Sequence, residues 1–388
     1  MNDDALNQGG RFVITGASGF IGRQLIPRMQ DAGCELLLVG RDVARLQAAF
    51  PGIRCCGYDE ISSQGQGFDT LVHLAVLNND SDTSAEEFER VNLGLLSDVL
   101  EHAKSAGIAR FVNVTTFHAI SGAESEYANS KRLALEHLET VTGIEVINLF
   151  LPAVYGDEFA GKLSIINKVP GFLRGATLTF LSAFAPTVHI DRVAGFLCQS
   201  APIVDRDVFL ANPQDRNIVF RIGKFLLDLS FIVGIIGVFW WLLLIVWILI
   251  PIDSPGPGIF AQQRIGKGGK PFTLYKFRTM RRGTRQAGTH EMGADSVTRI
   301  GTFLRKAKLD ELSQVWNVII GNLSLVGPRP CLPNQTQLIE ERQKRGVFDV
   351  RPGITGLAQI NHIDMSDPLI LARWDARYIA QKSLPSEL

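Results

Sequence analysis

The first half of the chain alternates short apolar runs with segments of helical periodicity. The apolar runs have the length of strands and cover residues 11–14, 35–40, 68–75 and 110–116. The segment RQLIPRMQDAG at 23–33 has the amphipathic pattern of a helix between the first two runs. Strands that alternate with helices are typical of a doubly wound parallel sheet. We therefore predict an α/β domain over residues 1–212.

One apolar segment in the middle of the chain is longer than any strand. Residues 229–250 read LSFIVGIIGVFWWLLLIVWILI, which is 22 residues without a charge. At ~1.5 Å per residue a straight helix of this length is about 33 Å long, enough to cross the hydrocarbon core of a membrane. Buried helices of soluble domains rarely contain so long an apolar run. We therefore predict a membrane-inserted helix with its flanks over residues 213–255.

Both flanks of the apolar segment are basic, which bears on its path through the membrane. Arg216, Arg221 and Lys224 precede it, and the basic run 264–285 follows it without an acidic residue. Positive flanks remain in the cytoplasm, so a helix that enters and returns fits better than a straight span. Gly234 and Gly237 could soften such a helix. We expect the chain to turn at its exit, at Pro251, Pro255 and Pro257.

Composition and charge support a chain of at least two parts. A length of 388 residues suggests two or three domains, and 46% apolar with 20% charged residues excludes a disordered chain. Residues 1–210 carry 16 Lys/Arg and 25 Asp/Glu, a net of −9, whereas residues 211–388 carry 23 and 14, a net of +9. The five cysteines are odd in number and lack metal-ligand spacing, which favours free thiols in a reducing compartment. No secretion signal opens the chain, so we expect it not to be secreted.

A glycine turn follows the first predicted strand. Gly16, Gly19 and Gly22 form G-x-x-G-x-x-G between strand and helix, where the backbone can approach a pyrophosphate at the helix N-terminus. The second strand ends at Arg41. An acid at that place suits the ribose 2′-hydroxyl of NAD, whereas an arginine suits the 2′-phosphate of NADP(H). We therefore expect NADP(H), with NAD as the alternative.

A tyrosine and a lysine four residues apart follow further along. Tyr127 and Lys131 in YANSK would share one face of a helix. The ammonium could then lower the pKa of the phenol, which could exchange a proton with a carbonyl or alcohol oxygen.

Together these motifs resemble the extended short-chain dehydrogenase/reductases of the nucleotide-sugar epimerase, dehydratase and reductase group. The resemblance covers residues 10–210 and implies a Rossmann-like fold. It implies that Thr116 (or Thr115) polarises the reacting oxygen, that Tyr127 is the acid/base, and that Lys131 holds the ribose and tunes Tyr127. Ala75 in the HLA segment would line the cofactor site. Phe117-His118 stand where dehydratases carry Asp-Glu, so reduction at C4 of a keto sugar, or 4-epimerisation, remains.

In the basic half, Asp310 and Glu311 are adjacent carboxylates in the segment FLRKAKLDEL. A carboxylate among cations stays ionised, and it can attack phosphorus or share a divalent metal with its neighbour. The surrounding segments LYKFRTM, LDELSQVWNVIIGNLSLVGPRP and VRPGITGLAQIN resemble the bacterial sugar transferases, the monotopic phosphoglycosyl transferases.

That second resemblance covers about residues 220–380 and implies a mainly helical α+β domain over 256–388. It implies that Asp310 attacks a UDP-sugar, releases UMP and passes the phosphosugar to undecaprenyl phosphate. Glu311 and Asp310 would hold Mg²⁺, and the basic run would face membrane lipid. The residues expected to bind phosphate are Arg264, Arg278, Arg305 and Arg329.

These expectations describe a bifunctional enzyme of the bacterial cytoplasmic membrane, with both domains on the cytosolic face. Its partners would be a UDP-sugar, undecaprenyl phosphate and lipid, without nucleic acid. A homodimer is left open. An alternative makes the first domain a non-catalytic module that senses a nucleotide and regulates the transferase.

Overall fold

The computed structural model describes residues 9–75, 90–120, 125–199, 203, 205–281, 283–284 and 296–388. Arg282 and Arg285 of the predicted basic run lie outside these residues. The chain divides into two compact units. One contains Met1–Leu178 and Pro186–Asn212, and the other contains Thr179–Ala185 and Pro213–Leu388. The five cysteines are free thiols, as the sequence predicts.

The first unit is built on a seven-stranded sheet with the order β3-β2-β1-β4-β5-β6-β9, in which every neighbouring pair is parallel. Its strands are β1 (Arg11–Thr15), β2 (Glu35–Val39), β3 (Arg54–Cys56), β4 (Thr70–His73), β5 (Arg110–Thr116), β6 (Glu145–Leu151) and β9 (Asp207–Phe209). The central strands are buried on both faces, as a sheet covered by helices on each side requires. The predicted doubly wound sheet is confirmed.

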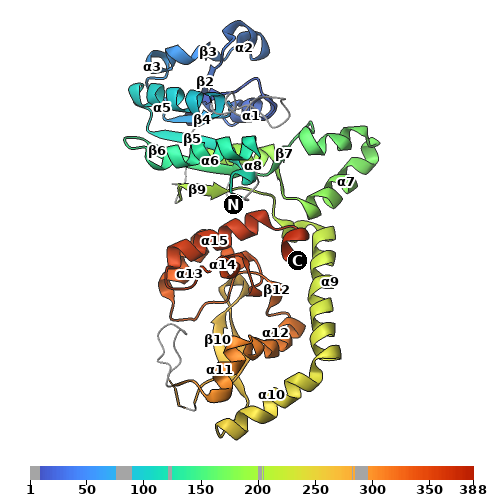
Figure 1. Cartoon of the computed structure of the whole chain (residues 1–388). Helices are drawn as coiled ribbons and strands as arrows, with labels where there is room; N and C mark the ends of the chain where they lie inside the picture. The colour runs from blue at the N-terminus through green and yellow to red at the C-terminus, as the bar shows by residue number, and fades with distance from the viewer. Residues whose placement is uncertain are drawn as a thin grey trace. The chain divides into compact units, whose positions relative to one another are not determined.

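Helices cover the two faces of this sheet (Figure 1). On one face lie α1 (Phe20–Asp31), α2 (Val43–Ala49) and α8 (Ile190–Leu197), which share a core cluster with the sheet. On the other face lie α3 (Ile61–Gln64), α5 (Leu95–Ser105) and α6 (Glu126–Glu139). A small parallel pair, β7 (Ala153–Tyr155) and β8 (Thr187–His189), and the helix α7 (Gly171–Phe184) complete this part of the chain.

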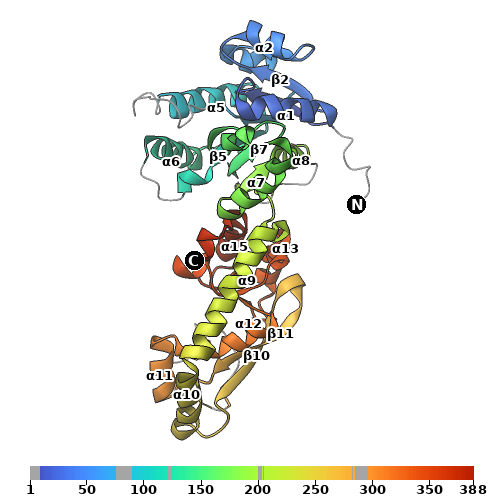
Figure 2. The same cartoon turned by 90° about the vertical axis from the view of Figure 1, so that its right-hand side faces the viewer.

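The apolar segment is broken rather than straight. It consists of α9 (Ile218–Val233), a π-helical turn η7 (Gly234–Val238) and α10 (Trp240–Asp253), and the two arms are bent by 66° (Figures 1 and 2). The break lies at Phe239, next to the two glycines, because a π turn interrupts the regular hydrogen bonds of a helix. Among the described residues, no single helix has the length and hydropathy of a membrane span, and only this bent pair reaches them together.

One detail of the predicted exit is wrong. Pro251 lies inside α10, which continues to Asp253, so it does not turn the chain. The chain leaves the helix at Ser254, whose backbone is extended. It turns at Gly256, whose φ of 124° is readily adopted by glycine and rarely by other residues. Pro255 lies within this turn.

Buried polar groups hold α9 to the rest of the second unit. The carboxylate of Asp228 accepts hydrogen bonds from the Ser324 hydroxyl at 2.9 Å and from the backbone N–H of Leu325 at 2.8 Å. The Lys224 ammonium donates to the carbonyl of Val326 at 2.9 Å and pairs with Glu387. An apolar helix that carries buried charges with partners of its own is fixed in its rotation about its axis.

Two small sheets and short helices form the remainder of the second unit. An antiparallel hairpin joins β10 (Ile259–Ile265) to β11 (Pro271–Phe277), and β12 (Ser324–Val326) pairs in parallel with β13 (Gly353–Thr355). The helices are α11 (Arg299–Lys306), η11 (Leu309–Gln314), α12 (Val315–Ile320), α13 (Thr336–Lys344), α14 (Leu357–Ile360) and α15 (Pro368–Gln381). A core of Leu338, Phe348 and Leu371 packs between α13 and α15.

Candidate active sites

The glycine turn of the first unit has the geometry of a close backbone approach. Gly16 has a φ of 73°, and a Cβ there would lie 2.6 Å from the backbone N of Ala75. A Cβ on Gly22 would lie 2.7 Å from the Cα of Ala17, so the first turn of α1 packs directly on the loop. Gly19 precedes α1 as its N-cap. Both positions therefore require glycine, and the close packing brings the loop to the N-terminus of α1, where helix N–H groups can bind a pyrophosphate.

Ala75 and Arg41 follow the carboxyl ends of β4 and β2, the two strands that flank β1. The N–H of Ala75 donates to the Thr15 hydroxyl at 3.4 Å, which places Ala75 against the glycine turn. Arg41 follows β2 and is exposed. In a doubly wound sheet, ligands bind outside the carboxyl ends of the strands. Both positions are therefore compatible with the predicted cofactor site.

The structure brings Tyr127 and Lys131 together on α6. The Lys131 ammonium lies 5.9 Å from the centre of the Tyr127 ring, and its side chain is buried. Burial lowers the pKa of Lys131 to about 7 and raises the pKa of Tyr127 above its ordinary value of 10. The expected lowering of the phenol's pKa by the lysine is thus reversed, because desolvation disfavours both charged forms.

The two candidate threonines end β5, beside α6. Thr116 is half-buried, and its hydroxyl accepts a hydrogen bond from the N–H of His118 at 3.4 Å. Thr115 is buried, and its hydroxyl has no hydrogen-bond partner among the described residues. Both candidates for polarising a substrate oxygen therefore remain.

In the second unit, Asp310 and Glu311 lie on η11, directly after Lys308, whose backbone is left-handed with a φ of 57°. The Glu311 carboxylate receives the Lys276 ammonium at 2.9 Å and the Arg329 guanidinium at 2.7 Å, both on its Oε1 atom. None of the described residues forms an ion pair with Asp310. The Glu311 carboxylate is therefore held in place by two cations, whereas the Asp310 carboxylate is available to react with a substrate.

The surroundings shift the two carboxyl groups in opposite directions. Burial raises the pKa of Asp310 above 3.8, and the charge of Glu311 raises it further against the opposing effect of Lys276. For Glu311, burial is outweighed by the charges of Arg329 and Lys276, which lower its pKa to about 2. Lys276 and Arg305 do lower the pKa of Asp310, as expected of surrounding cations, but burial outweighs them, so the net shift is upward.

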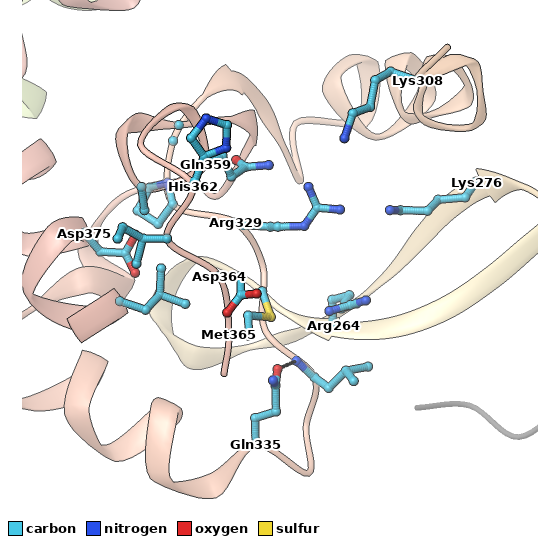
Figure 3. Close-up of a pocket in the computed structure, with 17 residues that line it drawn as sticks. Arg264, Lys276, Lys308, Arg329, Gln335, Gln359, His362, Asp364, Met365 and Asp375 are labelled. Atoms are coloured by element: carbon cyan, nitrogen blue, oxygen red, sulfur yellow. Dashed lines mark hydrogen bonds between the residues drawn. The ribbon is translucent and has the colours of Figure 1, made fainter. Parts of the chain in front are cut away.

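Two cavities lie side by side at this site and share part of their walls. The cavity of about 430 Å³ that contains Asp310 and Glu311, which we call the dyad cavity, also has Ile259 and Phe260 in its wall. A second cavity of about 560 Å³, the glutamine cavity, is lined by Gln335, Gln359 and Met365. Both cavities share four cationic side chains, and Figure 3 shows these gathered on one side of the glutamine cavity. The shared cations are Arg264, Lys276, Lys308 and Arg329.

The four predicted phosphate-binding arginines all line the dyad cavity but differ in their partners. Arg329 binds Glu311, and Arg305 donates to the Thr279 hydroxyl at 2.9 Å. Arg264 donates to the Pro330 carbonyl at 3.0 Å, and burial lowers its pKa to about 10. Arg278 is buried and donates to the carbonyls of Ser254, Pro255 and Gly256, so it holds the turn after α10.

A buried ion pair positions Arg329 from behind. Arg342 is fully buried, binds the Asp375 carboxylate at 2.7 Å and donates to the backbone carbonyl of Arg329 at 2.8 Å. Breaking a buried pair leaves an uncompensated charge, so this arrangement is rigid. It fixes the segment that carries Arg329 toward Glu311.

Asp310 and Glu311 are the residues that would hold Mg²⁺. No group of three or more His, Cys, Asp or Glu side chains suited to a metal occurs in the described part of the chain. Mg²⁺ is usually held by one or two carboxylates together with substrate phosphates, so two carboxylates would be enough on the side of the protein. Lys276 and Arg329 both donate to Oε1 of Glu311, so its Oε2 atom is the oxygen that would bind the metal.

Sequence reasoning missed three members of this site. Lys276 was part of the basic run expected to face lipid, but its ammonium points to Glu311. Arg342 and Asp375 lie 33 residues apart on α13 and α15, and no motif connected them to the carboxylate pair. Side chains two residues apart in a strand share a face, so Lys276 lies on the same face of β11 as the buried Leu274. This spacing is the signal from which an inward-facing Lys276 could have been predicted.

Comparisons with known proteins divide the chain in the same order. Residues 12–178 match the model of the NAD dependent epimerase/dehydratase family, and residues 219–388 match that of the bacterial sugar transferases. Both resemblances seen in the motifs are therefore confirmed.

Among curated relatives, the UDP-N-acetylgalactosamine-undecaprenyl-phosphate N-acetylgalactosaminephosphotransferase of Aeromonas hydrophila is 40% identical over 153 residues. This match covers 37% of this chain and 36% of the relative. A UDP-glucose:undecaprenyl-phosphate glucose-1-phosphate transferase of Caulobacter vibrioides is 43% identical over 123 residues, which cover 31% of this chain and 46% of that one. The chain thus spans less than half the length of either relative.

Among solved structures, the Bordetella bronchiseptica enzyme WbmG in complex with NAD and UDP is 17% identical, with a TM-score of 0.40. The match covers 50% of this chain and 71% of that one.

Proposed function

We propose that the second domain transfers a phosphosugar from a UDP-sugar to a polyprenyl phosphate. It follows, in the same chain, a domain of the NAD dependent epimerase/dehydratase type. The observation that carries the proposal is the pair Asp310 and Glu311, of which Glu311 is held by two cations and Asp310 has no ion-pair partner among the described residues. The names of the relatives, which are undecaprenyl-phosphate sugar phosphotransferases, support the same chemistry.

The reaction takes two displacements at phosphorus. A carboxylate oxygen of Asp310 attacks the sugar-bearing phosphorus of the donor, and the bond from that phosphorus to the bridging oxygen breaks, so UMP leaves with the electron pair. A phosphate oxygen of the polyprenyl phosphate then attacks the same phosphorus and releases the Asp310 carboxylate. Arg329 and Lys276 offset the charge of the diphosphate.

Mg²⁺ bound at the diphosphate would be held by Asp310 and Glu311 and would withdraw charge from the phosphate oxygens. The chain's own part is to keep Glu311 ionised. The Arg329 and Lys276 charges that lower its pKa to about 2 achieve this at every physiological pH.

The test of the transferase is UMP release by the purified chain with a panel of UDP-sugars, Mg²⁺ and polyprenyl phosphate. Asp310→Asn should reduce the rate at least 10³-fold, because the nucleophile is lost. Asp349→Asn, a change at an exposed acid outside the cavities, is the matched control. An undiminished rate in Asp310→Asn would reject the proposal.

For the first domain we propose reduction of a UDP-linked sugar at a C4 keto group, with NADPH. The glycine turn would hold the pyrophosphate, Arg41 the 2′-phosphate and Lys131 the ribose, and the cofactor would supply the hydride. Tyr127 would donate the proton to the carbonyl oxygen, and its raised pKa keeps the phenol protonated for this task.

Two alternatives for the first domain are separable by measurement. A 4-epimerase recycles its cofactor, so NADPH absorbance would not fall during turnover. A nucleotide-sensing module would leave the sugar of the product unchanged in Tyr127→Phe. Under our proposal, Tyr127→Phe should slow NADPH consumption by about 10²-fold or more while UMP release persists. Mass spectrometry of the lipid product, with and without NADPH, identifies the sugar.

A further inference from the structure

We infer that the glutamine cavity binds the nucleoside of the donor, and that Gln359 contacts the pyrimidine base. This inference rests on the proposed transferase function, and it assigns a site to the leaving half of the substrate. It starts from the wall of four cations that the two cavities share. Cations arranged between two cavities suit a diphosphate, whose two ends then point in opposite directions.

The position of Asp310 decides which end lies in which cavity. Asp310 lines the dyad cavity and is absent from the wall of the glutamine cavity. The phosphorus that it attacks, together with the sugar, must therefore lie in the dyad cavity. The bond that breaks points away from the nucleophile, so the departing phosphate and its nucleoside extend beyond the cations into the glutamine cavity.

The far wall of the glutamine cavity has the composition of a nucleoside site. Figure 3 shows the cations on one side, whereas His362 and Gln359, and below them Asp364, Met365 and Gln335, lie around the rest of the opening. A volume of about 560 Å³ is within the range of small-molecule sites. Apolar walls with a few amide groups suit an uncharged, hydrogen-bonding ring better than a second phosphate.

Gln359 provides the sharpest observation. Its amide N–H donates to the Ile354 carbonyl at 3.2 Å, and its carbonyl oxygen is buried without a hydrogen-bond partner among the described residues. A buried acceptor without a donor is costly, and a turn of the amide toward the cavity that Gln359 lines would pair this oxygen with the N–H of a pyrimidine ring. Next to it, His362 has a left-handed backbone with a φ of 60°, which presents the imidazole at the cavity.

The dyad cavity, by contrast, suits the acceptor. Its wall includes Pro257, Ile259 and Phe260, which follow the apolar helix α10 within a few residues. An isoprenoid phosphate can bury its chain against such residues while its phosphate takes the place between the cations that the UMP phosphate has left, in line with the bond from phosphorus to Asp310. The two cavities therefore separate the nucleoside of the leaving group from the isoprenoid chain of the acceptor.

Binding of UMP to the full-length protein in detergent tests the inference by calorimetry. Gln359→Leu should weaken UMP binding about 5- to 10-fold, as loss of one hydrogen bond requires. Met365→Trp, which fills the cavity, should weaken it at least 10-fold. Both variants should raise the KM for the UDP-sugar and leave the KM for polyprenyl phosphate unchanged. Gln343→Leu, at an exposed glutamine on α13, is the matched control.

The outcomes separate this inference from the proposed function. Wild-type UMP release with UMP affinities of both variants within twofold of wild type would overturn the inference and leave the transferase intact. Asp310→Asn should keep UMP affinity while losing turnover. Photo-crosslinking with 4-thio-UMP gives a readout that does not depend on the stability of the variants: label at 356–365 supports the inference, and label at 257–261 overturns it.

Discussion

Asp310 and Glu311 are neighbours in the sequence, yet they meet different surroundings. Burial raises the pKa of Asp310, whereas Arg329 and Lys276 overcome burial and lower the pKa of Glu311 to about 2. Two carboxyl groups whose pKa values are driven apart are suited to different roles. Glu311 remains a fixed anion, and Asp310 is a more basic carboxylate and hence a better nucleophile once ionised.

The first prediction concerns the pH dependence of phosphosugar transfer. Only ionised Asp310 attacks, and its pKa lies above 3.8, so kcat/KM for UMP release should fall as pH decreases through this raised value. Glu311→Gln removes a charge that raises the pKa of Asp310 and frees Lys276, which lowers it. The remaining activity of that variant should therefore have its acid limb at lower pH. A limb that moves to higher pH would contradict this account.

The second prediction concerns Lys131. Its pKa falls from 10.5 unfolded to about 7 folded, so the folded first unit binds fewer protons between these values and loses stability as pH decreases from 10.5 to 7. Lys131→Met should raise the free energy of unfolding of this unit by about 2–4 kcal/mol below pH 7, with the gain vanishing near pH 11. Hydrogen exchange of peptides from β5 and β6, compared with wild type at each pH, measures it.

Lys162→Met, at an exposed lysine, serves as the control for Lys131→Met and should change little. If both variants protect the β5 and β6 peptides from hydrogen exchange equally at pH 6, burial of the Lys131 ammonium does not destabilise the unit, and the prediction is wrong. Because Lys131 is also proposed to hold the cofactor, its replacement should abolish NADPH turnover while it stabilises the fold. Such an exchange of stability for function is common at active sites.

At the scale of elements, the break in the apolar segment is the main departure from a simple helix. No proline lies at the 66° bend; the π turn at Gly234–Val238 makes it, and Pro251 lies farther along inside α10. Asp228 and Lys224 fix the arm before the bend, and Arg278 holds the turn after α10. Both arms are thus attached to one unit, which supports the proposal of a helix that enters and returns.

The third prediction is the membrane topology that follows. Single cysteines replacing the exposed Arg216 and Gln263, in a chain whose own cysteines are serines, mark the two sides of the bent pair. A membrane-impermeant maleimide should reach neither in intact cells and both in inverted vesicles, if both flanks lie in the cytoplasm. Labelling of one cysteine from outside would show that the segment crosses the membrane.

At the scale of the whole molecule, two stretches of one polypeptide match two different families, the NAD dependent epimerase/dehydratase family over residues 12–178 and the bacterial sugar transferases over residues 219–388. Covalent linkage raises the effective concentration of one domain's product at the other. The acidic first half and the basic second half are consistent with different partners, a soluble substrate and an anionic membrane surface.

The fourth prediction tests the purpose of the fusion. Tyr127→Phe lacks only the proposed reductase and Asp310→Asn lacks only the transferase, so an equimolar mixture holds both activities on separate chains. The mixture should form the lipid-linked reduced sugar more slowly than the same concentration of active sites in the intact chain, and dilution should widen the difference. Equal rates at every dilution would mean that the linkage does not increase transfer between the domains.

The sequence by itself determined the order and class of the parts. Alternating apolar runs predicted the parallel sheet, and the glycine turn and YANSK motif fell at the strand and helix ends expected of them. These features are local, because strand period, turn chemistry and i, i+4 spacing act within a few residues. The carboxylate pair was found for the same reason, since its two members are adjacent.

Only the tertiary structure decided how the candidate residues differ from one another. Lys276 and Arg329 approach Glu311 from 35 and 18 residues away, and Arg342 meets Asp375 across 33 residues, so no local pattern could predict these pairings. Burial, which depends on the whole fold, reversed the expected pKa directions of Asp310 and Tyr127. Electrostatics and cavities are properties of groups brought together by folding, whereas sequence records only neighbours along the chain.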